Sequence, residues 1–374
     1  MNEFDDIFDP KPEDKDDLFN TDNRSKDRFA NDLYRQSDED KRNAFLFLIY
    51  IFVSLIITFV GGFMMNSQYA YLKDAIENVE ETTLLEFTVE DNINQDTNEI
   101  DITYPYLTNI TSEFTNNYDK EIPVFSVVVT FYDITNERIG TRVFTKENFL
   151  PGETFSLDEQ IVSSHEPIDI EYSIEVDAPS MVYTLISLAQ VTTLALLFFV
   201  VDKISFKRDW EDFKAKRKER VSNIFTGFLI VYASLIVANI ILMTLGTTET
   251  SQNEMLIQSM FSDSPLNLFL LFMLLCVLTP IVEEVIFRKV LYNFIEPRSN
   301  HIVAIILSGA IFGLMHVISF GDFVQAIPYV LMGLAFGFIY WKSNKNIYVV
   351  IGVHFLNNFL SWLLYVLAIY GIYG

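Results

Sequence analysis

The chain contains 374 residues, half of them hydrophobic and 34 of them Phe, and it carries a formal net charge of −24 at pH 7. This combination excludes a single uniform soluble domain, because apolar and acidic residues in such numbers must lie in separate segments. We also expect no nucleic-acid partner, because binding to a polyanion relies on basic residues. The only cysteine, Cys276, lies inside an apolar run, so no intramolecular disulfide can form.

Residues 1–42 form an acidic segment with fourteen Asp and Glu and no helical or strand periodicity. Such a segment lacks the apolar area needed to offset the entropy of ordering, so we expect a disordered cytoplasmic tail. Three acidic-aromatic tetrapeptides recur in it, DDIF at 5–8, DDLF at 16–19 and NDLY at 31–34. They are either simply part of the tail or short docking motifs for a cytoplasmic partner.

Runs of about 20 apolar residues, the length needed to cross roughly 30 Å of hydrocarbon, recur through the rest of the chain. They lie near residues 44–65, 181–201, 223–245, 266–294, 300–319, 323–341 and 347–371. We interpret residues 43–66 as a first membrane anchor, not a cleaved signal peptide, because a long acidic segment precedes them. Residues 181–201 are then the second span. The expected fold class is mainly α, a polytopic helical membrane protein with about seven spans.

Residues 67–180, between the first two spans, show a different pattern. Apolar and polar residues alternate in VFSVVVTFYD, RIGTRVF, TFSLDEQIV and IDIEYSIEV, and turn signals such as ITNE and LPGE separate these runs. Alternation with a period of two predicts strands that are buried on one face only. We therefore expect a small β-sandwich-like domain inserted between the first two spans.

The distribution of basic residues predicts the orientation in the membrane. The segment DKISFKRDWEDFKAKRKER, residues 202–220, is rich in Lys and Arg, whereas residues 247–264 contain none. Loops rich in Lys and Arg remain on the cytoplasmic side. We expect a cell-membrane protein in which residues 202–220 form a basic cytoplasmic loop, the N-terminus is cytoplasmic and residues 67–180 are extracytoplasmic.

Polar and ionisable residues occur inside the C-terminal apolar runs. An Asp, Lys or Arg at the centre of a membrane helix costs about 2.5–3.5 kcal/mol, so such residues indicate function. They are Glu283, Glu284, Arg288, His316, His354, Asn357 and Asn358.

The spacing of these residues predicts which of them act together. Residues four apart lie on one face of a helix, as do Glu284 with Arg288 and His354 with Asn358. Glu283 projects about 100° away from Glu284. We expect Arg288 to neutralise Glu284, which leaves Glu283 free to face a cavity.

Three motifs follow one another on successive apolar runs: EEVIFR at 283–288, FGLMH at 312–316 and HFLNN at 354–358. They resemble the EExxxR, FxxxH and HxxxN motifs of the type II CAAX prenyl endopeptidases and bacteriocin-processing or self-immunity proteins, a family called CPBP or Abi. The resemblance covers about residues 220–371. It implies that residues 221–374 are an intramembrane protease domain whose substrates are membrane-associated, prenylated or hydrophobic peptides.

The resemblance also implies a set of site residues, namely Glu283, Glu284, Arg288, His316, His354 and Asn358. In the mechanism that we expect, Glu283 is the general base that activates a water molecule, and His316 holds the same water. His354 and Asn358 donate hydrogen bonds to the oxyanion that forms. Glu284 and Arg288 brace the site.

The sequence leaves the need for a metal open. Glu283, His316 and His354 are enough ligands for a catalytic zinc ion with one open position. There is no HExxH motif, however, and each ligand would come from a different helix. A metal-free mechanism with a glutamate-activated water explains the same residues.

Two functions of other classes compete with a protease. A noncatalytic membrane sensor, assembly factor or bacteriocin self-immunity protein would use the β-rich domain and the tail, and would keep the polar cluster as a binding pocket. A transporter would also place ionisable residues inside the membrane, but transporters usually contain inverted repeats, and none is evident in this sequence. The three intact motifs favour the protease.

Overall fold

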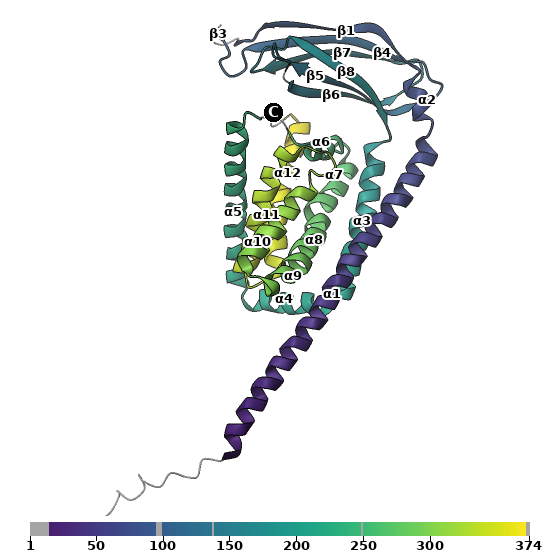
Figure 1. Cartoon of the computed structure of the whole chain (residues 1–374). Coiled ribbons are helices and arrows are strands. Elements are labelled where there is room, and N and C mark those ends of the chain that lie inside the picture. The colour runs from purple at the N-terminus through teal and green to yellow at the C-terminus, as the bar shows by residue number, and fades with distance from the viewer. Residues whose placement is uncertain (1–14, 95–98, 137, 248–249, 372–374) are drawn as a thin grey trace, which may run out of the picture.

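In the computed structural model a layer of β-strands lies across one end of a bundle of helices, and α1 (Lys15–Tyr69) runs past the side of the bundle (Figure 1). Backbone is described for residues 15–94, 99–136, 138–247 and 250–371, and side chains from residue 38 onward in these ranges.

Helix α1 differs from the disordered tail expected for residues 1–42. Residues 15–42 and the apolar residues that follow them form one continuous helix of 55 residues. Once the apolar segment is helical, each preceding residue adds a hydrogen bond without a new nucleation cost, which favours this extension. Residues 1–14, with the tetrapeptide DDIF, lie outside the described residues, as do the side chains of the other two tetrapeptides.

The β domain begins with the short helix α2 (Leu72–Ile76) and contains eight strands among the described residues. They are β1 (Val79–Asp91), β2 (Ile93–Asn94), β3 (Glu99–Ile100), β4 (Tyr106–Asn116), β5 (Ile122–Tyr132), β6 (Arg138–Phe149), β7 (Thr154–Ser163) and β8 (Asp169–Asp177).

Two antiparallel three-stranded sheets, in the orders β1-β4-β7 and β6-β5-β8, share one hydrophobic core, and β2 pairs with β3. Phe125 of β5 lies with its ring centroid 5.5 Å from that of Phe114 in the opposite sheet and 6.0 Å from that of Phe155. The four alternating runs of the sequence coincide with β5, β6, β7 and β8, which confirms the prediction of a β-rich region with two sheets packed on each other.

The helical part contains short segments as well as long apolar helices. They are α3 (Ser180–Val201), α4 (Lys203–Ala215), α5 (Arg217–Thr244), α6 (Gln252–Ser259), α7 (Pro265–Leu271), η1 (Phe272–Leu278), α8 (Thr279–Glu284), η2 (Val285–Tyr292), α9 (Asn293–Ile295), η3 (Glu296–Arg298), α10 (His301–Met315), η4 (Phe323–Gln325), α11 (Ala326–Lys342) and α12 (Ile347–Ile369).

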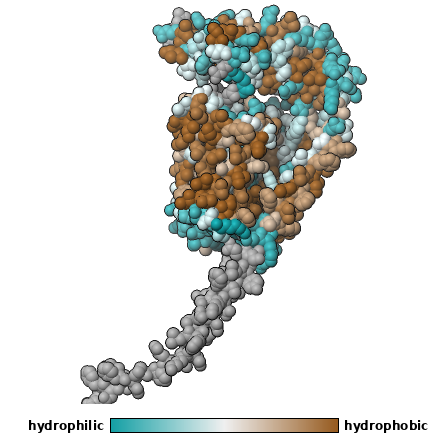
Figure 2. Space-filling model, in the orientation of Figure 1, coloured by the Kyte–Doolittle hydropathy of each residue, from teal (hydrophilic) through white to brown (hydrophobic). Residues whose placement is uncertain are grey.

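Six helices in the described part of the chain are long and apolar enough to cross a membrane, whereas about seven spans were expected. The difference is α10, which has 15 residues. At 1.5 Å per residue it is about 22 Å long, shorter than the roughly 30 Å of a hydrocarbon core. The predicted run 300–319 breaks because α10 ends before His316 and the chain then turns, with Gly321 in the left-handed region at φ +77°. Figure 2 shows hydrophobic residues over the helices and hydrophilic residues at the end away from the β domain.

Helices α10 and α11 approach each other backbone to backbone. A Cβ atom on Gly313 would lie 2.4 Å from the backbone nitrogen of Val330, and one on Gly309 would lie 2.7 Å from that of Leu334. Only glycine permits this approach, which small residues in membrane helices commonly provide. The contact fixes the end of α10, where His316 lies.

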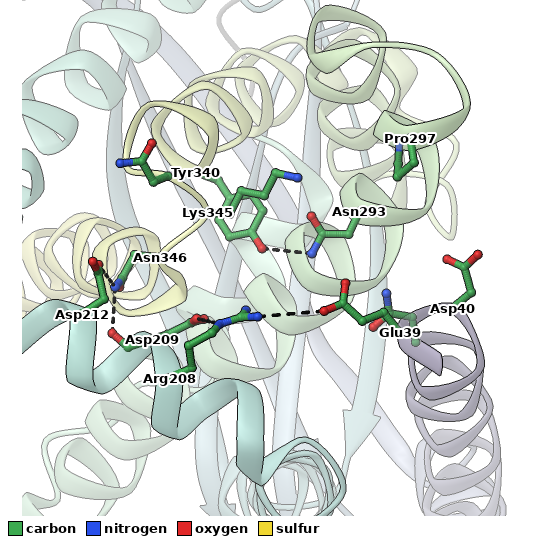
Figure 3. Close-up of a pocket in the computed structure, with 12 residues that line it drawn as sticks. Glu39, Asp40, Arg208, Asp209, Asp212, Asn293, Pro297, Tyr340, Lys345 and Asn346 are labelled. Carbon is green, nitrogen blue, oxygen red and sulfur yellow. Dashed lines mark hydrogen bonds and ion pairs between the residues drawn. The ribbon is translucent and has the colours of Figure 1, made fainter. Parts of the chain in front are cut away.

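At the end away from the β domain, acidic and basic residues of distant segments join in ion pairs. Arg42 of α1 lies 2.8 Å from Asp202, and Arg208 of α4 lies 3.9 Å from Glu39 of α1. Figure 3 shows Glu39 and Arg208 at a polar cavity, with Arg208 between Glu39 and Asp209. Residues 202–220, expected to be a loop, are therefore helix α4 and the start of α5, held against α1.

Cysteine labelling tests the predicted orientation. Ser173 on β8 and Ala215 at the end of α4 are exposed, while the native Cys276 is buried and contributes little background. A membrane-impermeant maleimide is expected to label Ser173→Cys in intact cells and Ala215→Cys only after permeabilisation, because the basic residues near Ala215 hold that end inside. The reverse pattern would show that the orientation is wrong.

Candidate active site

The adjacent carboxylates Glu283 and Glu284 lie on α8, a stretch of regular α-helix between two π-helical segments. The segment η1 precedes α8 and η2 follows it. π-Helical turns are rare and occur frequently at functional sites, because the wider turn changes which way side chains point. The two carboxylates thus lie on a short regular segment with an irregular turn on either side.

A side chain of α12 forms a hydrogen bond with the backbone of η1. In η1 the N–H of Thr279 donates to the carbonyl of Leu274, five residues earlier. The next carbonyl in this pattern, that of Leu275, would accept from residue 280, which is Pro280 and has no N–H. Nδ2 of Asn358 donates to the Leu275 carbonyl instead, at 2.9 Å. Asn358 was expected to face an oxyanion, and the structure gives one of its two amide hydrogens this structural partner.

Glu284 and Arg288 form a fully buried ion pair, with Nε of Arg288 2.9 Å from Oε2 of Glu284. Nη1 of Arg288 donates to Oγ of Ser308 on α10 at 3.2 Å. The guanidinium carbon lies 5.5 Å from the ring centroid of Phe312 and 5.9 Å from that of Phe336. The pair therefore connects α8 and η2 to α10 within an aromatic enclosure.

His354 of α12 lies between the two glutamates. Its Nδ1 is 2.9 Å from Oε1 of Glu284, and its Nε2 is 3.7 Å from Oε2 of Glu283. The imidazole is buried and stacks on the ring of Phe336 with centroids 4.6 Å apart. Because the carboxylate of Glu284, paired with Arg288, accepts from Nδ1, the orientation of the imidazole is set and Nε2 faces Glu283.

His316 caps the C-terminal end of α10 on the other side of Glu283. Its Nδ1 lies 2.8 Å from the carbonyl oxygen of Phe312, and its Nε2 lies 3.9 Å from Oε1 of Glu283. The carbonyl can only accept, so Nδ1 carries the hydrogen and Nε2 of the neutral ring is an acceptor. The ring of Tyr329 stacks on this imidazole with centroids 4.6 Å apart.

Four of the six predicted residues line a cavity of about 390 Å³, namely Glu283, His316, His354 and Asn358. This volume lies within the range of small-molecule sites, about 300–1,000 Å³. Glu283 is 23% exposed, whereas Glu284 and Arg288 are fully buried behind it. The structure thus brings all six residues together and separates the accessible carboxylate from the enclosed one.

The cavity has further lining residues that the sequence did not single out. They include Tyr50 of α1, Glu254 of α6 and Tyr329 of α11. The hydroxyl of Tyr329 lies 2.8 Å from Oγ of Ser251, so this ring links His316 to α6. An aromatic residue in an apolar run, or a Glu in a polar linker, has no unusual pattern. Spacing could not have revealed them.

The side chains do not fit a bound zinc ion as they are placed. In the described part of the chain, no three His, Cys, Asp or Glu side chains converge closely enough to hold a metal. This holds for Glu283, His316 and His354 too, the ligand set that the sequence allows.

Comparisons with known proteins support a family assignment for this region. Residues 265–360 match the family described as type II CAAX prenyl endopeptidase Rce1-like. The chain is 28% identical over 131 residues to the "Putative membrane peptidase YdiL" of Bacillus subtilis (strain 168), which covers 35% of this chain and 50% of that protein. It is 28% identical over 207 residues to an "Uncharacterized protein" of Mycoplasma capricolum subsp. capricolum, covering 52% and 59%. The chain spans about half the length of the curated relatives it matches. No solved structure matches.

Residues 265–360 belong to the Rce1-like family. The Rce1-like segment contains all six predicted site residues and starts at α7. Family membership and the apolar helices together make this a membrane protein. Residues 92–185, which form most of the β domain, match a separate family described as a protein of unknown function, DUF3426. Helix α1, which contributes Tyr50 to the cavity, precedes both matches.

Proposed function

We propose that this protein is a membrane endopeptidase that hydrolyses peptide bonds of membrane-associated substrates with a water molecule activated by Glu283. The position of Glu283 is the observation that carries the proposal. Its carboxylate reaches the cavity, and its two oxygens lie 3.9 Å from Nε2 of His316 and 3.7 Å from Nε2 of His354. Both separations are too long for a direct hydrogen bond, but atoms about 4 Å apart can contact one water at hydrogen-bond distance.

The first step is attack of the water on the scissile carbonyl. A water held between Glu283 and His316 donates one hydrogen to Oε1 and the other to Nε2 of His316, which is an acceptor in the neutral ring. Its lone pair then points away from both residues. As the C–O bond forms, Glu283 takes the proton, the role of a general base.

The second step is cleavage of the C–N bond. The tetrahedral oxyanion accepts hydrogen bonds from His354, when both of its ring nitrogens carry hydrogen, and from the second amide hydrogen of Asn358. The proton on Glu283 moves to the leaving nitrogen, the C–N bond breaks, and a carboxylic acid and an amine are released. Glu284, held by Arg288, orients His354 throughout.

A cleavage assay tests the proposal. Purified full-length protein in detergent is incubated with peptides that carry a fatty acyl or prenyl group, because the cavity lies within apolar helices, and products are identified by mass spectrometry. Cleavage of at least one such peptide is expected. If a broad panel of lipidated and hydrophobic peptides remains intact while the protein is folded, the proposed activity is wrong.

Chelation tests whether the proposed hydrolysis needs a metal ion. Treatment with 1,10-phenanthroline, followed by its removal, is expected to leave turnover unchanged, because Glu283 and His316 activate the water without a metal. A thermolysin sample serves as the positive control for chelation. Loss of turnover that returns on addition of zinc would assign the water to a metal ion instead.

A further inference from the structure

Helix α6 brings a second accessible carboxylate to the active-site cavity. Glu254 lines the same cavity as Glu283 and is half-buried. Ser251 caps the N-terminus of α6 through a bond from the Glu254 N–H to its Oγ, at 3.1 Å, and Oγ of Ser251 also contacts the hydroxyl of Tyr329. Glu254 is therefore held in place by the backbone of a helix that is anchored to the wall of the cavity.

The carboxylate of Glu254 has no cationic partner in the described part of the chain. Among the described residues no hydrogen bond or ion pair reaches it, and burial raises the pKa of this carboxyl group. The polar cavity of Figure 3 is different, because Arg208 there lies 3.9 Å from Glu39 and 3.2 Å from Asp209. A half-buried carboxylate without a counterion costs stability, and such groups in clefts are candidates for ligand binding.

The other lining residues suit a positively charged group. No Lys or Arg lines this cavity in the part of the chain that the structure describes, whereas Tyr329, Trp362 and Tyr365 contribute aromatic rings. Aromatic faces attract ammonium and guanidinium groups, and a carboxylate forms its strongest hydrogen bonds with the same groups. With Glu254 and Glu283 both facing it, a carboxylate inside the cavity would meet like charge.

We propose that Glu254 is a specificity-determining residue that binds the side chain of a Lys or Arg in the substrate. The inference rests on the proposed peptidase function and names its substrate class, membrane-associated peptides with a basic residue near the scissile bond.

The test compares dodecanoylated decapeptides that contain a single Lys, Gln or Glu, moved one position at a time along the peptide. The full-length protein in detergent is expected to cleave the best Lys peptide with a kcat/KM about tenfold or more above its Gln counterpart, the effect of one charge-assisted hydrogen bond. Glu254→Gln is expected to remove this preference, and Glu254→Lys to reverse it in favour of the Glu peptide.

A matched control removes the same charge from the same linker. Asp263, between α6 and α7, is exposed and does not line the cavity. Asp263→Asn is expected to keep the preference for Lys. If this variant loses the preference as Glu254→Gln does, the effect is a general one of net charge and the role of Glu254 is overturned.

Binding separates this inference from the proposed activity. The same peptides, labelled with a fluorophore, are titrated with the Glu283→Gln variant, alone and combined with Glu254→Gln, and fluorescence polarisation is measured. A Lys preference in binding that Glu254→Gln abolishes supports the inference even if no peptide is cleaved, a result that would contradict the peptidase alone. Three results would overturn the role of Glu254. They are equal binding of the Lys, Gln and Glu peptides, a Lys preference that survives Glu254→Gln, and no binding of any peptide.

Discussion

Glu283→Gln is expected to lower kcat for peptide cleavage by about 10²- to 10⁴-fold, the usual contribution of a general base. The amide has the same shape as the carboxylate but cannot accept the proton of the attacking water. Because Glu283 has no ion-pair partner at hydrogen-bond distance among the described residues, the variant is expected to insert into the membrane and to melt at the same or a higher temperature. Turnover and thermal melting of the purified protein in one detergent measure both effects.

The same chemical change at an exposed position provides the control. Glu211 on α4 is exposed, and its contact with Lys207 spans 3.9 Å at the surface. Glu211→Gln is expected to leave turnover unchanged. Wild-type turnover in Glu283→Gln would refute the assignment of the base, and a lowered melting temperature would show that Glu283 has a structural role as well.

Glu284→Gln is expected to destabilise the protein by about 3–5 kcal/mol, the typical cost of removing one partner of a buried ion pair. Arg288 would keep its charge without a counterion among the described residues, and its Nη2 is already buried there without a hydrogen-bond partner. His354 would also lose the carboxylate that accepts from its Nδ1. A lower melting temperature and a lower turnover should therefore occur together.

A double variant separates the effect on stability from the effect on turnover. Glu284→Gln combined with Arg288→Met removes both charges, so part of the lost stability should return. Turnover should stay low, because the ionised carboxylate that orients His354 is still missing. The melting temperatures of wild type, Glu283→Gln, Glu284→Gln and the double variant in one detergent decide the matter. Equal destabilisation by the two single variants, or no recovery in the double, would mean that the roles of the glutamates are assigned wrongly.

The apolar runs, the strands of the β domain and the pairing of Glu284 with Arg288 could all be predicted from the sequence. Each depends on residues close together in the chain. A run of apolar residues determines whether a helix is buried in lipid, alternation with a period of two determines which face of a strand is buried, and a spacing of four brings two side chains together on one helix face. The resemblance to the Rce1-like motifs predicted which residues belong to one site, but it did not predict how those residues are arranged.

Other features were decided only by the tertiary structure. His354 lies 70 positions after Glu284, and only the packing of α12 against α8 and η2 places it between the two glutamates. The bond from Asn358 to the Leu275 carbonyl arises because a missing N–H at Pro280 meets a neighbouring helix. Glu254 has no unusual sequence context, and only the packing of the helices places it in the wall of the cavity. Local patterns set the type of each segment because they involve neighbours in the chain, whereas contacts between helices depend on how those segments pack.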